Sequence, residues 1–92
     1  MNKSLKRYWF ILSKTDKFGL RNIGVSALSV SRAKLIILEN LHLLTFFRIV
    51  SSDIDEAEVI ENIDVRFLDP NHVIPNMGSV IFQGIWFPQL NI

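Results

Sequence analysis

The chain has 92 residues with no cysteine, 49% of them are hydrophobic, and the formal net charge at pH 7 is +1. These values predict one soluble domain (1–92) and exclude a disordered chain, and no apolar run approaches the roughly 20 residues of a membrane span. The lack of cysteine excludes disulfides and thiolate metal ligands, and it favours a reducing, cytoplasmic location.

The first part of the chain predicts a β-hairpin. Aromatic and β-branched residues dominate residues 7–13, which predicts a strand buried on both faces. A polar turn at 15–17 leads to a second predicted strand, Phe18 to Leu28, in which Gly19 and Gly24 indicate a bulge or a close backbone approach. Because the connection is short, we expect the two strands to pair antiparallel.

A single helix is predicted next. Ser29 is a suitable N-cap, since its side-chain oxygen can accept a hydrogen bond from a free backbone N–H of the first turn. The apolar residues that follow recur at a spacing of three or four, which places them on one helical face: Val30, Ala33, Ile37, Leu41 and Leu44. We therefore expect one helix that begins at Ser29 and ends near Leu44.

The second half of the chain predicts a shorter set of extended segments. They are a strand at Phe46 to Val50, a loop or short turn at Ser51 to Glu58, an extended segment at Val59 to Phe67, and a closing strand at Ser79 to Phe87. Between the last two, the prolines and glycine of residues 69–78 predict an ordered loop that is pinned to the body, with Gly78 at positive φ.

Together these elements predict an α+β fold in the order β-β-α-β-β, with one helix packed on a mainly antiparallel sheet of three to five strands. The first and last strands are the richest in aromatic residues, so we expect both to be central in the sheet. Trp9 and Trp86 should then be buried, each with a hydrogen-bond partner for its indole N–H.

The candidate binding site is a run of carboxylates. Residues 1–48 carry nine Lys and Arg against two acidic residues, whereas residues 49–92 carry one Arg against seven acidic residues. Within the acidic half, five carboxylates fall in nine residues: Asp53, Asp55, Glu56, Glu58 and Glu61. Such a run is either a solvated loop or a surface that attracts a basic partner, and we take these five residues as the predicted partner-binding site.

Two other readings have less support in the residues. The basic N-terminal half, residues 3–34, contains aromatics that would stack on bases if this half bound nucleic acid. A site around Asp69 and His72 would make the chain an enzyme, but a loop histidine more often bonds to backbone. No catalytic group, metal site or cofactor is predicted, and we expect that the protein is not an enzyme.

The closing part of the chain resembles a known group of proteins. The residues DPNHVIPNMG at 69–78, followed by GIWFP at 84–88, are similar to the closing signature of a family of small, poorly characterised bacterial proteins. An aromatic strand, a Gly-Val-Ser-Ala segment at 24–27 and a Ser-capped helix extend the resemblance over most of the chain. The resemblance implies a shared fold rather than a defined activity.

The combined prediction is a small binding protein of the immunity type. Small size, the absence of a catalytic constellation and the acidic run suit a protein that covers the basic surface of a partner toxin, such as a nuclease. A basic nucleic-acid-binding module is the alternative. The sequence leaves the identity of the toxin and the oligomeric state open.

Overall fold

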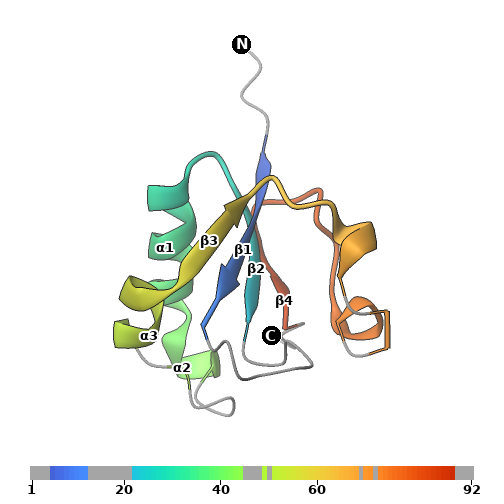
Figure 1. The fold of residues 1–92 in the computed structure, drawn as a ribbon. Helices are drawn as coiled ribbons and strands as arrows, with labels where there is room; N and C mark the ends of the chain where they lie inside the picture. Colours follow the sequence, from blue (N-terminus) through green and yellow to red (C-terminus); the bar gives the residue numbers. More distant parts are fainter. Residues whose placement is uncertain are drawn as a thin grey trace.

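In a computed structural model, the chain forms a four-stranded antiparallel sheet in the order β3-β1-β2-β4 (Figure 1). The strands are β1 (Lys6–Ile11), β2 (Ile23–Ala27), β3 (Glu58–Glu61) and β4 (Gly84–Phe87), and the helices are α1 (Val30–Glu39), α2 (Leu41–Leu44) and α3 (Ser51–Glu56). The structure describes residues 5–12, 22–44, 49, 51–68, 70–71 and 73–88. The predicted α+β class is confirmed, but three helices are present in this part of the chain where one was expected.

The predicted hairpin is confirmed, and β1 is buried on both faces. Tyr8 pairs with Val25 across the antiparallel β1–β2 ladder, and Tyr8, Trp9 and Phe10 are all buried. Because successive side chains of a strand point to opposite faces, β1 contributes to a core on each side of the sheet. Of the predicted second strand, residues 18–21 lie outside the described residues.

The closing strand differs from its prediction in both length and position. It begins at Gly84 rather than Ser79, and it lies at an edge of the sheet rather than in the centre. Before Gly84 the chain is held by a side chain: the Ser26 hydroxyl donates a hydrogen bond to the Val80 carbonyl, with 2.6 Å between the two oxygens. The β-favouring residues Ile81 and Phe82 follow this contact; they are exposed and lie outside the strand.

One face of the sheet is covered by helices. Ser29 caps α1 as predicted, with its hydroxyl accepting a hydrogen bond from the Arg32 backbone N–H at 3.2 Å. The expected single helix is interrupted at Asn40, whose side-chain amide donates to the Ile36 carbonyl while its backbone N–H donates to the Ile37 carbonyl. Such local side-chain bonds compete with helix continuation, which explains why α2 is a separate short helix.

The segment before β3 is helical rather than a loop. Ile54 is fully buried and anchors α3 to the core beside α1, so tertiary packing stabilises a helix that the charged sequence does not favour alone. The predicted extended segment Val59 to Phe67 ends early, because Asn62 has a φ of 60° and a 3-10 turn forms at Val65–Phe67. The strand predicted at Phe46 to Val50 lies outside the described residues, except for buried Ile49.

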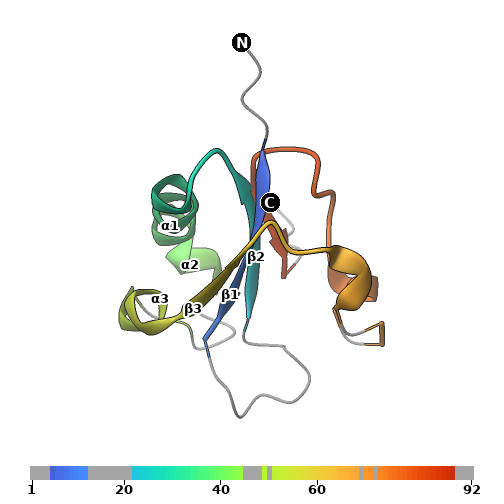
Figure 2. The ribbon, with the colours of Figure 1, turned by 45° about the horizontal axis from the view of Figure 1, so that its top comes forward.

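The opposite face of the sheet is covered by the irregular segment between β3 and β4 (Figure 2). This segment contributes Leu68 and Val73 to a second core, which also contains Trp9, Trp86 and Phe87. The predicted pinned loop is thus supported at Val73, while Asp69 and His72 lie outside the described residues.

The conformational prediction for Gly78 is wrong. The Gly78 N–H donates to the Trp86 carbonyl at 2.6 Å, and among the described glycines only Gly84 has a positive φ, of 137°. The chain bends instead through a 3-10 turn at Ile74–Asn76 and at Gly84, so these positions provide the reversal that was assigned to Gly78.

A close approach was predicted at Gly24 and is confirmed. A Cβ atom on Gly24 would lie 2.5 Å from ring carbons of Trp86, so only glycine leaves space for that ring. Trp9 stacks on the Trp86 ring with 5.7 Å between centroids and 18° between planes. The Trp86 indole N–H is buried and finds no acceptor within the described residues, contrary to the expectation that it would be paired.

Candidate functional site

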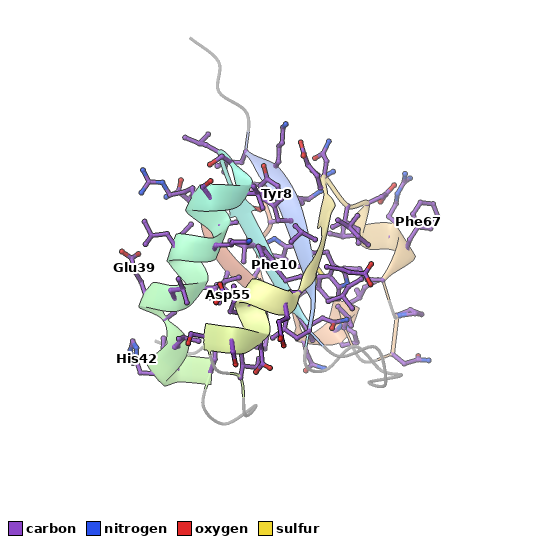
Figure 3. All side chains as sticks on the ribbon, turned by 60° about the vertical axis from the view of Figure 1, so that its left-hand side comes forward. Tyr8, Phe10, Glu39, His42, Asp55 and Phe67 are labelled. Atoms are coloured by element: carbon purple, nitrogen blue, oxygen red, sulfur yellow. The ribbon has the colours of Figure 1, made fainter. Side chains whose placement is uncertain are left out.

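The predicted acidic site is divided between two elements. Asp53, Asp55 and Glu56 belong to α3, whereas Glu58 and Glu61 belong to β3. Ile54 points into the core, so the neighbouring Asp55 and Glu56 are exposed on the outer side of α3 (Figure 3 labels Asp55).

The two carboxylates of β3 do not share one face of the sheet. Glu58 is opposite Ile11 and Glu61 is opposite Tyr8 in the β1–β3 ladder. Ile11 packs in the core on the loop-covered face and Tyr8 in the core on the helix-covered face. Glu58 and Glu61 therefore point to opposite faces of the sheet, and the five predicted residues do not form one continuous surface.

Glu61 is engaged by the chain itself. Its carboxylate forms a salt bridge with the Lys6 ammonium at 2.5 Å, across the β1–β3 pair. This hydrogen bond and the charge of Glu61 raise the pKa of Lys6 above its ordinary value. The Glu61 charge is thus compensated locally, which removes it from the charges that a partner would meet.

The remaining four candidates differ in whether their side chains interact with other residues of the chain. Asp53 is half-buried, and Asp53 and Glu58 each interact with another residue of the chain. Asp55 and Glu56 are exposed and form no ion pair within the described residues. The candidate site is therefore the outer side of α3, with Asp55 and Glu56 as its centre.

The basic end of the chain offers a poorer binding surface than its composition suggests. Tyr8, Trp9 and Phe10 are buried in the two cores and leave no exposed ring on which a base would stack. Lys6 is paired with Glu61, and the Arg7 guanidinium donates from Nε to the Ile63 carbonyl at 2.8 Å. Lys6 and Arg7 therefore contribute mainly to structure.

Neither a metal site nor a membrane span is found in the described residues. No group of three or more His, Asp or Glu side chains in those ranges could hold a metal ion. None of the described helices has both the length and the apolar character that crossing a membrane requires.

Sequence reasoning missed a set of exposed apolar side chains. Phe67 is 83% exposed, and Ile81 and Phe82 are 72% and 68% exposed. All three lie in the irregular segment that covers the second core, and Figure 3 shows Phe67 extending away from the body. Their β-favouring character predicted strand positions. Only the nearby Ser79 and Gly84, residue types that are common in turns, indicated an irregular segment.

The comparisons with known proteins found no relative of this chain. No protein-family model matches the chain, and searches of curated proteins and of solved structures found no match. The surface chemistry of the chain therefore carries the functional proposal.

Proposed function

We propose that this protein is a small, non-catalytic binding protein of the immunity type, which neutralises a toxin by docking the outer side of α3 on a basic surface of that toxin. The observation that carries the proposal is the exposed pair Asp55 and Glu56, which has no compensating cation within the described residues. The resemblance of residues 69–78 and 84–88 to the closing signature of small bacterial proteins is compatible with this role.

The charge arrangement supports a basic partner. Adjacent carboxylates repel each other and contribute nothing to the buried core, so folding does not require them. A partner that supplies positive charge would relieve this repulsion and would be attracted over a distance of several ångströms. Toxins that cleave nucleic acid carry such a basic surface, because their substrate is polyanionic.

The way in which α3 is held also suits a docking element. Ile54 fixes the helix from its inner side, so the outer side can be altered without disturbing the core. Substitution of exposed residues usually changes the free energy of unfolding by less than about 0.5 kcal/mol. Binding and stability should therefore be separable at Asp55 and Glu56.

The test is a protection assay against the product of the gene immediately upstream, because immunity genes follow the genes of their toxins. The variant Asp55→Asn with Glu56→Gln removes two negative charges from α3. The control Ser79→Lys with Gln83→Lys makes the same change in net charge at two exposed positions outside α3. We expect the first variant to lose protection while it stays folded, and the control to protect as well as the wild type.

Equal protection by both variants would contradict the acidic-surface proposal. The nucleic-acid alternative makes a different prediction: binding of labelled RNA or DNA that is lost on changing Lys3, Lys6 and Arg7. The buried aromatics at 8–10 make this alternative the less supported one.

A further inference from the structure

The outer face of α1 is apolar where a surface helix is ordinarily polar. Ala33, Ile36 and Ile37 pack into the core, as expected for the inner face. On the other side, Leu35 is 44% exposed and Leu38 is 41% exposed. A helix that carries apolar residues on both sides normally has a second contact on its outer side.

The charged residues at the two ends of α1 are placed against the helix dipole. Arg32 lies in the first turn and Glu39 is the last helical residue, and the first turn has no acid and the last turn no base. Acidic groups favour the N-terminus of a helix and basic groups its C-terminus, so both charges are unfavourably placed in α1 alone. Neither forms an ion pair within the described residues, and Figure 3 shows Glu39 extending away from the sheet.

The spacing of these charges is self-complementary. Arg32 and Glu39 are seven residues apart, close to two helical turns, and therefore lie on the same flank of the helix with Leu35 between them. When two such helices pack antiparallel around a two-fold axis near Leu35, Arg32 of each copy lies beside Glu39 of the other. The unfavourable charge at each helix end then faces an opposite charge, and the two helix dipoles also run in opposite directions.

We propose that the outer face of α1 is a two-fold interface between two copies of this chain. Leu35 and Leu38 form its apolar centre, and two reciprocal Arg32–Glu39 ion pairs flank that centre. A two-fold interface uses the same patch on both partners, so it requires a patch that is complementary to itself. The charge order of α1 meets this requirement, which is why a second copy is the occupant that fits it.

The interface is small, and the dimer should be correspondingly weak. The helix spans ten residues, or about 15 Å at the usual rise per residue. Stable interfaces bury about 800 Å² on each partner, so a single short helix provides a limited contact. We expect a dissociation constant in roughly the micromolar range or above, which rises with salt because ion pairs at the rim are screened.

Sedimentation velocity across a concentration series tests the ion pairs. Arg32→Glu alone and Glu39→Arg alone should each weaken dimerisation at least about tenfold, because each places like charges side by side. The double variant Arg32→Glu with Glu39→Arg restores the pairing in reversed order and should recover the dimer. A wild type that stays monomeric up to millimolar concentration would overturn the proposal, as would a folded double variant that stays as weak as the single ones.

Cross-linking tests the position of the axis. The chain has no cysteine, so a single introduced thiol reports on one position only. Leu35→Cys lies beside its own copy across the axis and should form disulfide-linked dimers on mild oxidation. Phe67→Cys, which is more exposed but lies on the other side of the sheet, is the control and should cross-link much more slowly. Equal rates at the two positions would contradict an interface at α1.

This interface is independent of the proposed docking surface. Arg32 and Glu39 belong to α1, whereas the candidate site is on α3. The single charge variants of α1 should therefore dissociate the dimer without abolishing protection against the toxin, and the α3 variant should leave the dimer intact.

Discussion

The two faces of the sheet are covered in different ways although β1 serves both. On one face, Tyr8 and Phe10 pack against the helices, which satisfy their own backbone hydrogen bonds. On the other, Trp9 packs against Trp86 and Phe87 beneath a segment with little regular structure. The first core is spread over several helical residues, whereas the second depends on one aromatic stack.

The irregular cover has to be held by individual contacts. Asp64 caps the 3-10 turn that begins this segment, and its carboxylate also binds the Arg66 guanidinium, at 2.6 Å between Oδ2 and the nearest nitrogen. Farther along the segment, the Gly78 N–H donates to the Trp86 carbonyl. A face built from a few specific contacts should be more sensitive to single substitutions than a face built from helices.

The largest effect is expected at the contact between Gly24 and Trp86. Gly24→Ala would place a methyl group 2.5 Å from the Trp86 ring, so the stack on Trp9 must shift. We expect a loss of about 1–3 kcal/mol in the free energy of unfolding, measured by urea denaturation. Combining Gly24→Ala with Trp86→Phe, which shortens the ring, should cost less than the sum of the two single changes. Strict additivity would show that the close contact does not limit this position.

A smaller effect is expected at Gly84. Its φ of 137° is unfavourable for any residue with a side chain, although no atom would clash with an added Cβ. Gly84→Ala should therefore cost more than about 1 kcal/mol through backbone strain alone. Gly78→Ala is the matched control, since Gly78 does not have a positive φ. The melting temperature should fall less in the Gly78→Ala variant than in the Gly84→Ala variant. The reverse order would mean that the strained position is wrongly assigned.

On the helix-covered face, the clearest local contribution is the N-cap of α1. Ser29→Ala removes the acceptor for the Arg32 backbone N–H and should cost about 1 kcal/mol. Ser29→Asp, which keeps an acceptor at the cap, should restore most of that loss. If both variants unfold at the same urea concentration as the wild type, the cap does not stabilise α1.

The smallest effect is expected in the pH dependence of the loop-covered face. The hydrogen bonds from Arg66 lower the pKa of Asp64 from 3.8 to about 2. A lowered pKa in the folded state stabilises the protein above the unfolded value, and that contribution is lost as the pH falls from about 4 to about 2. Asp64→Asn should therefore show a flatter decline in melting temperature over this pH range. Parallel curves for variant and wild type would exclude a role for this pair.

The sequence predicted the helix-covered face better than the loop-covered face. The aromatic and β-branched run of β1 and the helical spacing of Ala33 and Ile37 are strong local signals, and these residues are buried as expected. The irregular segment between β3 and β4 has no hydrophobic periodicity in its sequence. Its 3-10 turns and the exposure of Phe82 depend on tertiary contacts, which local sequence does not encode. The helix at α3 was missed for a related reason, since one buried isoleucine stabilises it.

The candidate site was predicted in composition but not in shape. The acidic run was identified from its density, yet its division between α3 and β3 follows from the boundary after Glu56 and from the ladder register. The pairing of Glu61 with Lys6 joins residues 55 positions apart, which a linear charge count does not reveal. Of the five predicted residues, Asp55 and Glu56 therefore remain as the centre of the candidate site.

The most direct test of the proposed function is the affinity of the purified protein for the product of the gene immediately upstream, the position that the proposal assigns to the toxin, measured by titration calorimetry at several salt concentrations. For Asp55→Asn with Glu56→Gln we predict an affinity at least about tenfold below that of the wild type, with a weaker dependence on salt and unchanged unfolding. The Ser79→Lys, Gln83→Lys control should bind with the wild-type affinity. Unchanged affinity and salt dependence in the α3 variant would contradict the proposal that α3 docks on a basic toxin surface.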